Sequence, residues 1–147
     1  MYKFTFILGL VLLTVIKSEG QQQTTKAQEP PKKANKIIVL VRDSANNFLD
    51  RIASILYDKG YTIENKDEKV KFISTKERQG EKWSTYYKVR ARINDTAIVF
   101  TGQIALNKNG DYWDIDYRGS KVSALREAWN ELDAIARKFG NNIVYSK

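Results

Sequence analysis

The stretch WSTYYKVRARINDTAIVFTGQIAL, residues 83–106, decides the fold of this chain. Apolar and polar side chains alternate along its first half, which is typical of a strand with one buried face. Asn94–Asp95 then makes a turn into a second strand over residues 98–106. The first strand is expected to bury Trp83, Thr85, Tyr87, Val89, Ala91 and Ile93, and the second strand to bury Ile98, Phe100, Gly102, Ile104 and Leu106 on the same face.

Working outward from this hairpin, residues 36–41 and 70–75 are short β-branched runs that predict strands, and residues 61–64 predict an extended segment between them. Apolar residues at helical spacing predict a helix over 48–60 and another from a Ser120 cap to Gly140. The turn Asn109–Gly110 predicts a further strand over 112–118, with Trp113, Ile115 and Tyr117 facing inward, and residues 143–145 could add a short one. The expected fold is α+β, in the order β-α-β-β-β-β-α: an antiparallel meander sheet with two helices packed on one face, and Trp129 in the core between them.

The N-terminus has the features of a secretory signal peptide over residues 1–20. Lys3 precedes a short apolar run, and Ser18 and Gly20 place small residues before a cut at Gln21. The apolar run is shorter than the ~20 residues that span a bilayer. Residues 21–35 are polar and contain both prolines, which predicts a disordered tether. The sequence therefore predicts one folded domain over residues 36–147 of an exported protein, periplasmic or extracellular and soluble, with no membrane span.

The order of elements resembles small exported domains with a TATA-box-binding-protein-like or helix-grip fold, many of unknown function. It is also similar to the repeated domain of the outer-membrane assembly lipoprotein C. The resemblance rests on residues 45–63, a helix closing on Asp58-Lys59-Gly60-Tyr61-Thr62-Ile63, and on Val70-Lys71-Phe72-Ile73-Ser74-Thr75, a strand ending in Thr. The chain lacks the lipidated Cys of that lipoprotein, and no functional residue can be transferred to it. The resemblance implies a fold and no activity.

Composition excludes most catalytic chemistry. The chain has no His and no Cys, so it has no imidazole base, no thiolate nucleophile and no His- or Cys-ligated metal. Asp114 and Asp116 stand two residues apart on one strand face, but an open sheet offers a carboxylate pair no cleft. Asn94-Asp95-Thr96 fits the N-glycosylation sequon and equally a plain hairpin turn. We expect no catalytic residue, metal or cofactor, and no enzyme.

The outward face of the sheet is the best candidate for a binding site. Lys88, Arg90 and Arg92 form a basic row with Tyr86 at its end, in a chain of net charge +8. Apolar residues also fall on this face: Ile73, Val99 and Tyr112, and either Ile38 and Leu40 or their neighbours Ile37, Val39 and Val41. The expected partner is a protein or a second copy, with an anionic surface as a further option. Export argues against nucleic acid.

The residues therefore predict a binding or scaffolding module that acts through Tyr86, Lys88, Arg90, Arg92, Val99 and Tyr112. The alternative is a carrier of a small ligand with a pocket between the C-terminal helix and the sheet. A gap beside Gly102 under Trp129 would favour the carrier, and a filled core would disfavour it.

Overall fold

The computed structural model describes residues 29–41, 47–81, 84–118 and 123–147. The expected signal peptide, most of the expected tether and Trp83 lie outside these residues. The elements along the chain are β1 (Lys36–Leu40), α1 (Phe48–Asp58), β2 (Ile63–Asp67), β3 (Phe72–Thr75), β4 (Arg78–Gln79), β5 (Tyr86–Ile93), β6 (Ala97–Ala105), β7 (Trp113–Asp114), α2 (Ala124–Arg137) and β8 (Ile143–Ser146).

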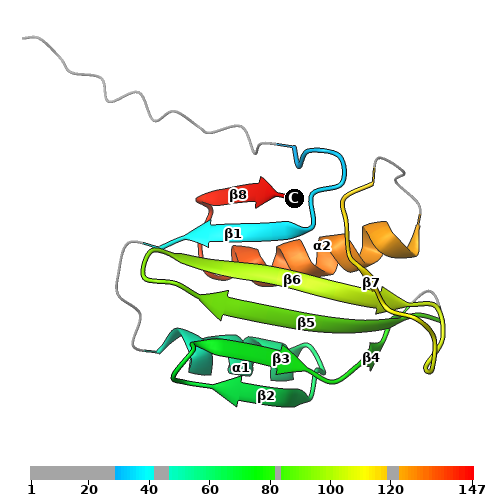
Figure 1. Ribbon diagram of the computed structural model, residues 1–147, viewed down its shortest axis with the longest axis horizontal. Coiled ribbons are helices and arrows are strands. Elements are labelled where there is room, and N and C mark those ends of the chain that lie inside the picture. Colours follow the sequence, from blue (N-terminus) through cyan, green and yellow to red (C-terminus); the bar gives the residue numbers. More distant parts are fainter. Residues whose placement is uncertain (1–28, 42–46, 82–83, 119–122) are drawn as a thin grey trace, which may run out of the picture.

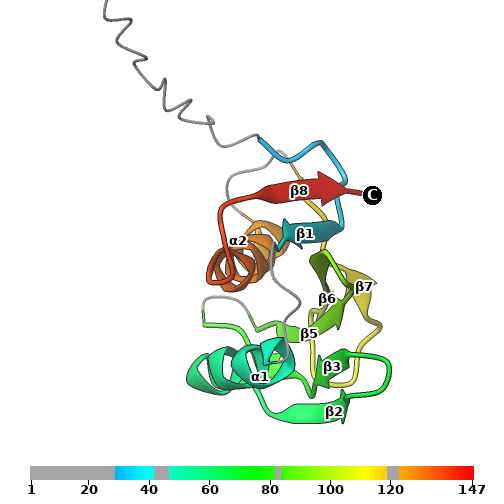
Figure 2. The same ribbon diagram turned by 90° about the vertical axis from the view of Figure 1, so that its left-hand side faces the viewer.

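The strands form one sheet in the spatial order β2-β3-β5-β6-β1-β8, and every pairing is antiparallel. β4 pairs with β5, and β7 pairs with β6. The expected α+β class is confirmed, and the strand order is more complex than a meander because β1 lies between β6 and β8 (Figure 1). Figure 2 shows both helices on the same side of the sheet. The sheet therefore has a helix side and an open face.

The alternation in β5 has the predicted register. Tyr87, Val89, Ala91 and Ile93 are buried on the helix side, and Thr85 just before the strand is buried as well. On α2, Trp129 is 2% exposed and packs edge-on against Tyr117, with ring centroids 5.7 Å apart. The ring of Tyr145 on β8 also packs against this indole, with ring centroids 5.9 Å apart. The predicted position of Trp129 in the core is confirmed.

Three residues differ from the predicted burial. Ile73 was expected on the open face, but it is fully buried because it stands beside Ala91 in the β3–β5 register. Trp113 was expected inside, but it is 51% exposed because β7 has only two residues and pairs only with β6. Leu106 lies beyond the last residue of β6 and is exposed in the turn that follows.

The contacts of the domain begin upstream of Lys36. The Tyr117 hydroxyl donates to a carboxylate oxygen of Glu29 at 2.8 Å. Ala34 is fully buried, and its carbonyl accepts from the Tyr117 amide at 2.7 Å. The Asn35 amide donates to the carbonyl of Ser146 on β8. Residues 29–35 therefore fold against the end of the sheet, with a turn at Lys32 and Lys33 before β1 begins.

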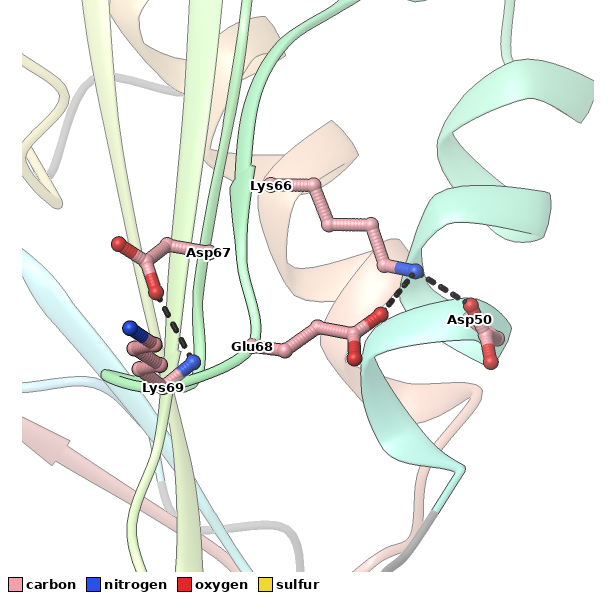
Figure 3. Close-up of polar contacts among 5 residues, drawn as sticks. All are labelled: Asp50, Lys66, Asp67, Glu68 and Lys69. Atoms are coloured by element: carbon pink, nitrogen blue, oxygen red, sulfur yellow. Dashed lines mark hydrogen bonds and ion pairs between the residues drawn. The ribbon is translucent and has the colours of Figure 1, made fainter.

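A polar contact links α1 to the outer strand β2. Lys66 points toward the helix, and its ammonium donates to Asp50 at 2.6 Å and to Glu68 at 3.2 Å (Figure 3). Asp67, the next residue, points the other way, and its carboxylate accepts from the Lys69 amide in the turn after β2. The two carboxylates that contact Lys66 are mostly exposed, so water screens these ion pairs and they add little to stability.

Candidate binding surface

The strand β5 supplies the basic row on the open face. Because Tyr87, Val89, Ala91 and Ile93 point to the helices, the alternate side chains of the strand point to the open face. Arg90 and Arg92 are exposed, while Tyr86 and Lys88 are half-buried. The structure therefore places Tyr86, Lys88, Arg90 and Arg92 together along one strand, as the alternation predicts.

A single cross-strand row links Arg92 to apolar residues of four other strands. Arg92 stands opposite Val99 of β6, which stands opposite Ile38 of β1. Ile38 in turn stands opposite Val144 of β8, which is 44% exposed. On the other side of Arg92, Phe72 of β3 completes the row. Val99 therefore adjoins the basic row directly, and the apolar residues continue away from it.

The two arginines of the basic row contact uncharged neighbours. Arg90 donates to the side-chain oxygen of Gln103 at 2.8 Å. The guanidinium of Arg92 lies 6.0 Å from the centre of the Phe72 ring. Within the described part of the chain, no carboxylate pairs with either group. Their charge is therefore available to a ligand on this face.

Lys88 and Tyr112 form a contact of their own at the end of the row. The Lys88 ammonium lies 4.3 Å from the centre of the Tyr112 ring and 4.0 Å from a carboxylate oxygen of Glu77. Burial, followed by the charge of Glu77, raises the pKa of Tyr112. Since Glu77 partly neutralises Lys88, the strongest positive charge of the row lies at Arg90 and Arg92 rather than at Lys88.

Three residues of this face are placed by β1 and β8. Ile38 and Leu40 of β1 point outward, because Ile37 and Val39 are the buried pair of that strand. The sequence left both registers of β1 open, and it gave no sign that Val144 joins the same surface. That neighbourhood depends on β1 lying between β6 and β8, a pairing of distant segments that no local pattern encodes.

A second polar cluster lies on the helix side, around Glu131 of α2. The Tyr61 hydroxyl donates to Glu131 at 2.8 Å, and Arg78 of β4 forms an ion pair with the same carboxylate oxygen. The Arg78 guanidinium also lies 4.8 Å from the centre of the Tyr61 ring. Burial raises the pKa of Tyr61 far above its ordinary value, so its hydroxyl stays protonated. The cluster joins β4 and the segment after α1 to α2, and we assign it a structural role.

The other sequence candidates do not converge on a site. The Asp116 carboxylate accepts a hydrogen bond from Arg118 at 2.7 Å. Asp114 lies on the exposed strand β7, opposite Gln103 of β6. The described residues hold no group of three or more acidic, His or Cys side chains arranged for a metal. Asn94 begins the β5–β6 turn, where its amide donates to the carbonyl of Ala97.

The space beside Gly102 is filled. A methyl group built on Gly102 would come within 2.7 Å of the Ile115 side chain. Ile115 is itself 1% exposed, and its amide donates to the Gly102 carbonyl at 2.9 Å. The residues that could have lined a gap under Trp129 therefore pack against one another, and this part of the core lends the carrier alternative no support.

Comparison with known proteins adds no relative. The sequence matches no protein-family model and no curated protein. Among the helices of the described residues, none has the length and apolar character needed to cross a membrane.

Proposed function

We propose that this chain is an exported, non-catalytic binding module whose open sheet face receives an acidic protein. The observation that carries the proposal is the pair of exposed guanidinium groups of Arg90 and Arg92, which no carboxylate of the described residues neutralises. Arg is a frequent anchor of protein interfaces because its planar fork can bind a carboxylate through two hydrogen bonds.

The surroundings of the two arginines also favour a protein partner. Aromatic and aliphatic side chains lie beside them on the same face, among them Phe72 and Val99. Such a mixture is typical of the centre of a protein interface, whereas a surface that binds by charge alone has no use for exposed aliphatic groups. The net charge of +8 would in addition speed the encounter with an acidic partner.

Binding of poly-L-glutamate to the purified chain tests the proposal. An exposed ion pair contributes up to about 1 kcal/mol, so the loss of two should weaken binding about tenfold in the Arg90→Gln/Arg92→Gln variant. Lys59→Gln/Lys138→Gln is the matched control, because it removes the same charge from exposed residues that follow the two helices. Titrations at low and physiological salt should show the affinity falling as salt rises.

Three results would overturn the proposal. Equal losses in the two variants would mean that the polymer responds to net charge alone. Unchanged affinity in the arginine variant would place binding elsewhere. Tighter binding to phosphatidylglycerol vesicles than to poly-L-glutamate, lost in the arginine variant, would make a membrane surface the partner.

A further inference from the structure

The two outer strands of the sheet differ in how they are protected against pairing with another chain. β2 and β8 lie at the two ends of the strand order (Figure 1). β2 contains the charged residues Glu64, Lys66 and Asp67, and its register shifts between Ile63 and Asn65. Charges and bulges of this kind discourage an edge strand from joining a further strand. β8 has the sequence Ile-Val-Tyr-Ser and pairs with β1 in an unbroken register, so its outer edge carries neither protection.

Hydrogen bonds show which backbone groups of β8 point away from the sheet. The carbonyl of Asn142, just before β8, accepts from the amide of Leu40 on β1 at 2.9 Å. Backbone groups of successive residues point to opposite sides of a strand. Val144 therefore also faces β1, whereas Ile143 and Tyr145 present their backbone groups at the outer edge.

Tyr145 offers both a donor and an acceptor at this edge. The Ile143 amide already donates to the carbonyl of Asn141 at 3.0 Å. Within the part of the chain that the structure describes, no backbone group pairs with the amide or the carbonyl of Tyr145. Its ring packs against Trp129 and its hydroxyl donates to Asp133, so the side chain holds this part of the strand in place.

A second copy of β8 matches this edge. Two antiparallel β8 strands related by a two-fold axis at Tyr145 place this residue opposite itself, so that each amide donates to the carbonyl of the other copy. Because β8 is uncharged, the pairing opposes no like-charged side chains of the strand. Val144, which is 44% exposed on the open face, then lies beside Ser146 of the second copy. The match is self-complementary and needs no residue that the chain itself does not supply.

We propose that the chain forms a weak two-fold dimer through antiparallel pairing of β8 with β8 of a second copy. The two sheets join into one, and the open faces of both copies lie on the same side of it. A strand of four residues buries little surface, so we expect a dissociation constant of about 10–1,000 µM. The proposal goes beyond the proposed function, because it concerns an edge of the sheet rather than its open face.

Amide hydrogen exchange of the full chain, followed by NMR, tests the pairing in the wild type. Pairing gives the Tyr145 amide an acceptor, so exchange should occur mainly from the monomer. The Tyr145 amide should therefore exchange about two- to fourfold more slowly at about 1 mM protein than at about 50 µM.

Val144→Lys tests the same pairing by placing a charge at the edge. The lysines of the two copies repel each other across the axis, which should raise the dimer dissociation constant at least about tenfold in sedimentation equilibrium. The concentration dependence of Tyr145 exchange should disappear as well. Val70→Lys is the matched control, because Val70 is 57% exposed in the turn after β2. Circular dichroism spectra that match the wild type establish that both variants fold.

Salt separates this dimer from the binding of an acidic partner. Both copies carry positive charge, so the dimer should become tighter as salt rises, whereas binding of poly-L-glutamate should weaken. The failure of either proposal therefore leaves the other standing.

Four results would overturn the inference. The chain could remain a monomer at every concentration up to about 1 mM. Equal protection of the Tyr145 amide at all concentrations would place its partner within the same chain. Equal effects of Val144→Lys and Val70→Lys would exclude the β8 edge. A dimer lost in Arg90→Gln/Arg92→Gln but kept in Val144→Lys would make the open face the surface of self-association.

Discussion

Two tryptophans in contrasting environments give the sharpest test at the scale of single residues. Trp129 is 2% exposed between Tyr117 and Tyr145, whereas Trp113 is 51% exposed. Truncation of a buried Trp costs about 3–5 kcal/mol, so Trp129→Ala should remove a large share of a domain stability of about 5–15 kcal/mol. Trp113→Ala should change it by less than about 0.5 kcal/mol. Urea denaturation measures both, and a similar loss in the two variants would contradict the assignment of the core.

Tyrosine ionisation should make the domain sensitive to alkaline pH. Burial raises the pKa of Tyr145 to about 12 and that of Tyr61 still further, whereas both ionise near 10 in the unfolded chain. Between these values the folded chain keeps protons that the unfolded chain releases, so stability is fully present below pH 10 and falls as the pH rises toward 12. Urea midpoints measured between pH 8 and 11.5 should decline less steeply for Tyr61→Phe/Tyr145→Phe. Parallel curves for the variant and the wild type would contradict this assignment.

At the scale of elements, the start of α2 depends on one hydroxyl. The Ser123 side chain accepts from the Arg126 amide at 3.1 Å, in extended backbone before the first helical residue. The expected cap, Ser120, lies outside the described residues. Ser123→Ala should cost about 0.5–2 kcal/mol in the free energy of unfolding, as for other N-caps. Ser120→Ala is the control and should leave thermal stability unchanged; the reverse order of effects would move the helix start upstream.

Local periodicity explains which elements could be predicted. β5 alternates over its whole length, so its register and the grouping of Lys88, Arg90 and Arg92 follow from the sequence. The two-residue strand β4 leaves no periodic signal, and it exists because Arg78 and Gln79 pair with Tyr87 and Tyr86. The sequence predicted only part of the aliphatic surface on the open face. Val144 joins this surface through β1, whose place in the sheet depends on contacts between distant segments.

At the scale of the whole molecule, the proposal of export makes a prediction about the mature N-terminus. Cleavage after Gly20 would leave Gln21 as the first residue, with a short segment before the contacts that begin at Glu29. N-terminal sequencing of protein secreted by a bacterial host should yield Gln-Gln-Gln-Thr-Thr. Replacing Ser18 and Gly20 by Arg should block processing while leaving the folded domain unchanged. Recovery of an intact Met1 from the wild type would contradict export by this route.

The position of β1 between β6 and β8 has a consequence for when the domain can fold. The Lys36 ammonium contacts the carbonyl of Lys147, 111 residues away, and β8 pairs with β1 along its length. A chain emerging from a ribosome or a translocation channel holds β1 unpaired on one side until residues 143–146 appear. Contacts between such distant segments slow folding, because the loop they close must be ordered first. Completion of the sheet is therefore a late event, and a nascent chain that stops short of residue 143 exposes β1 as a bare aliphatic edge.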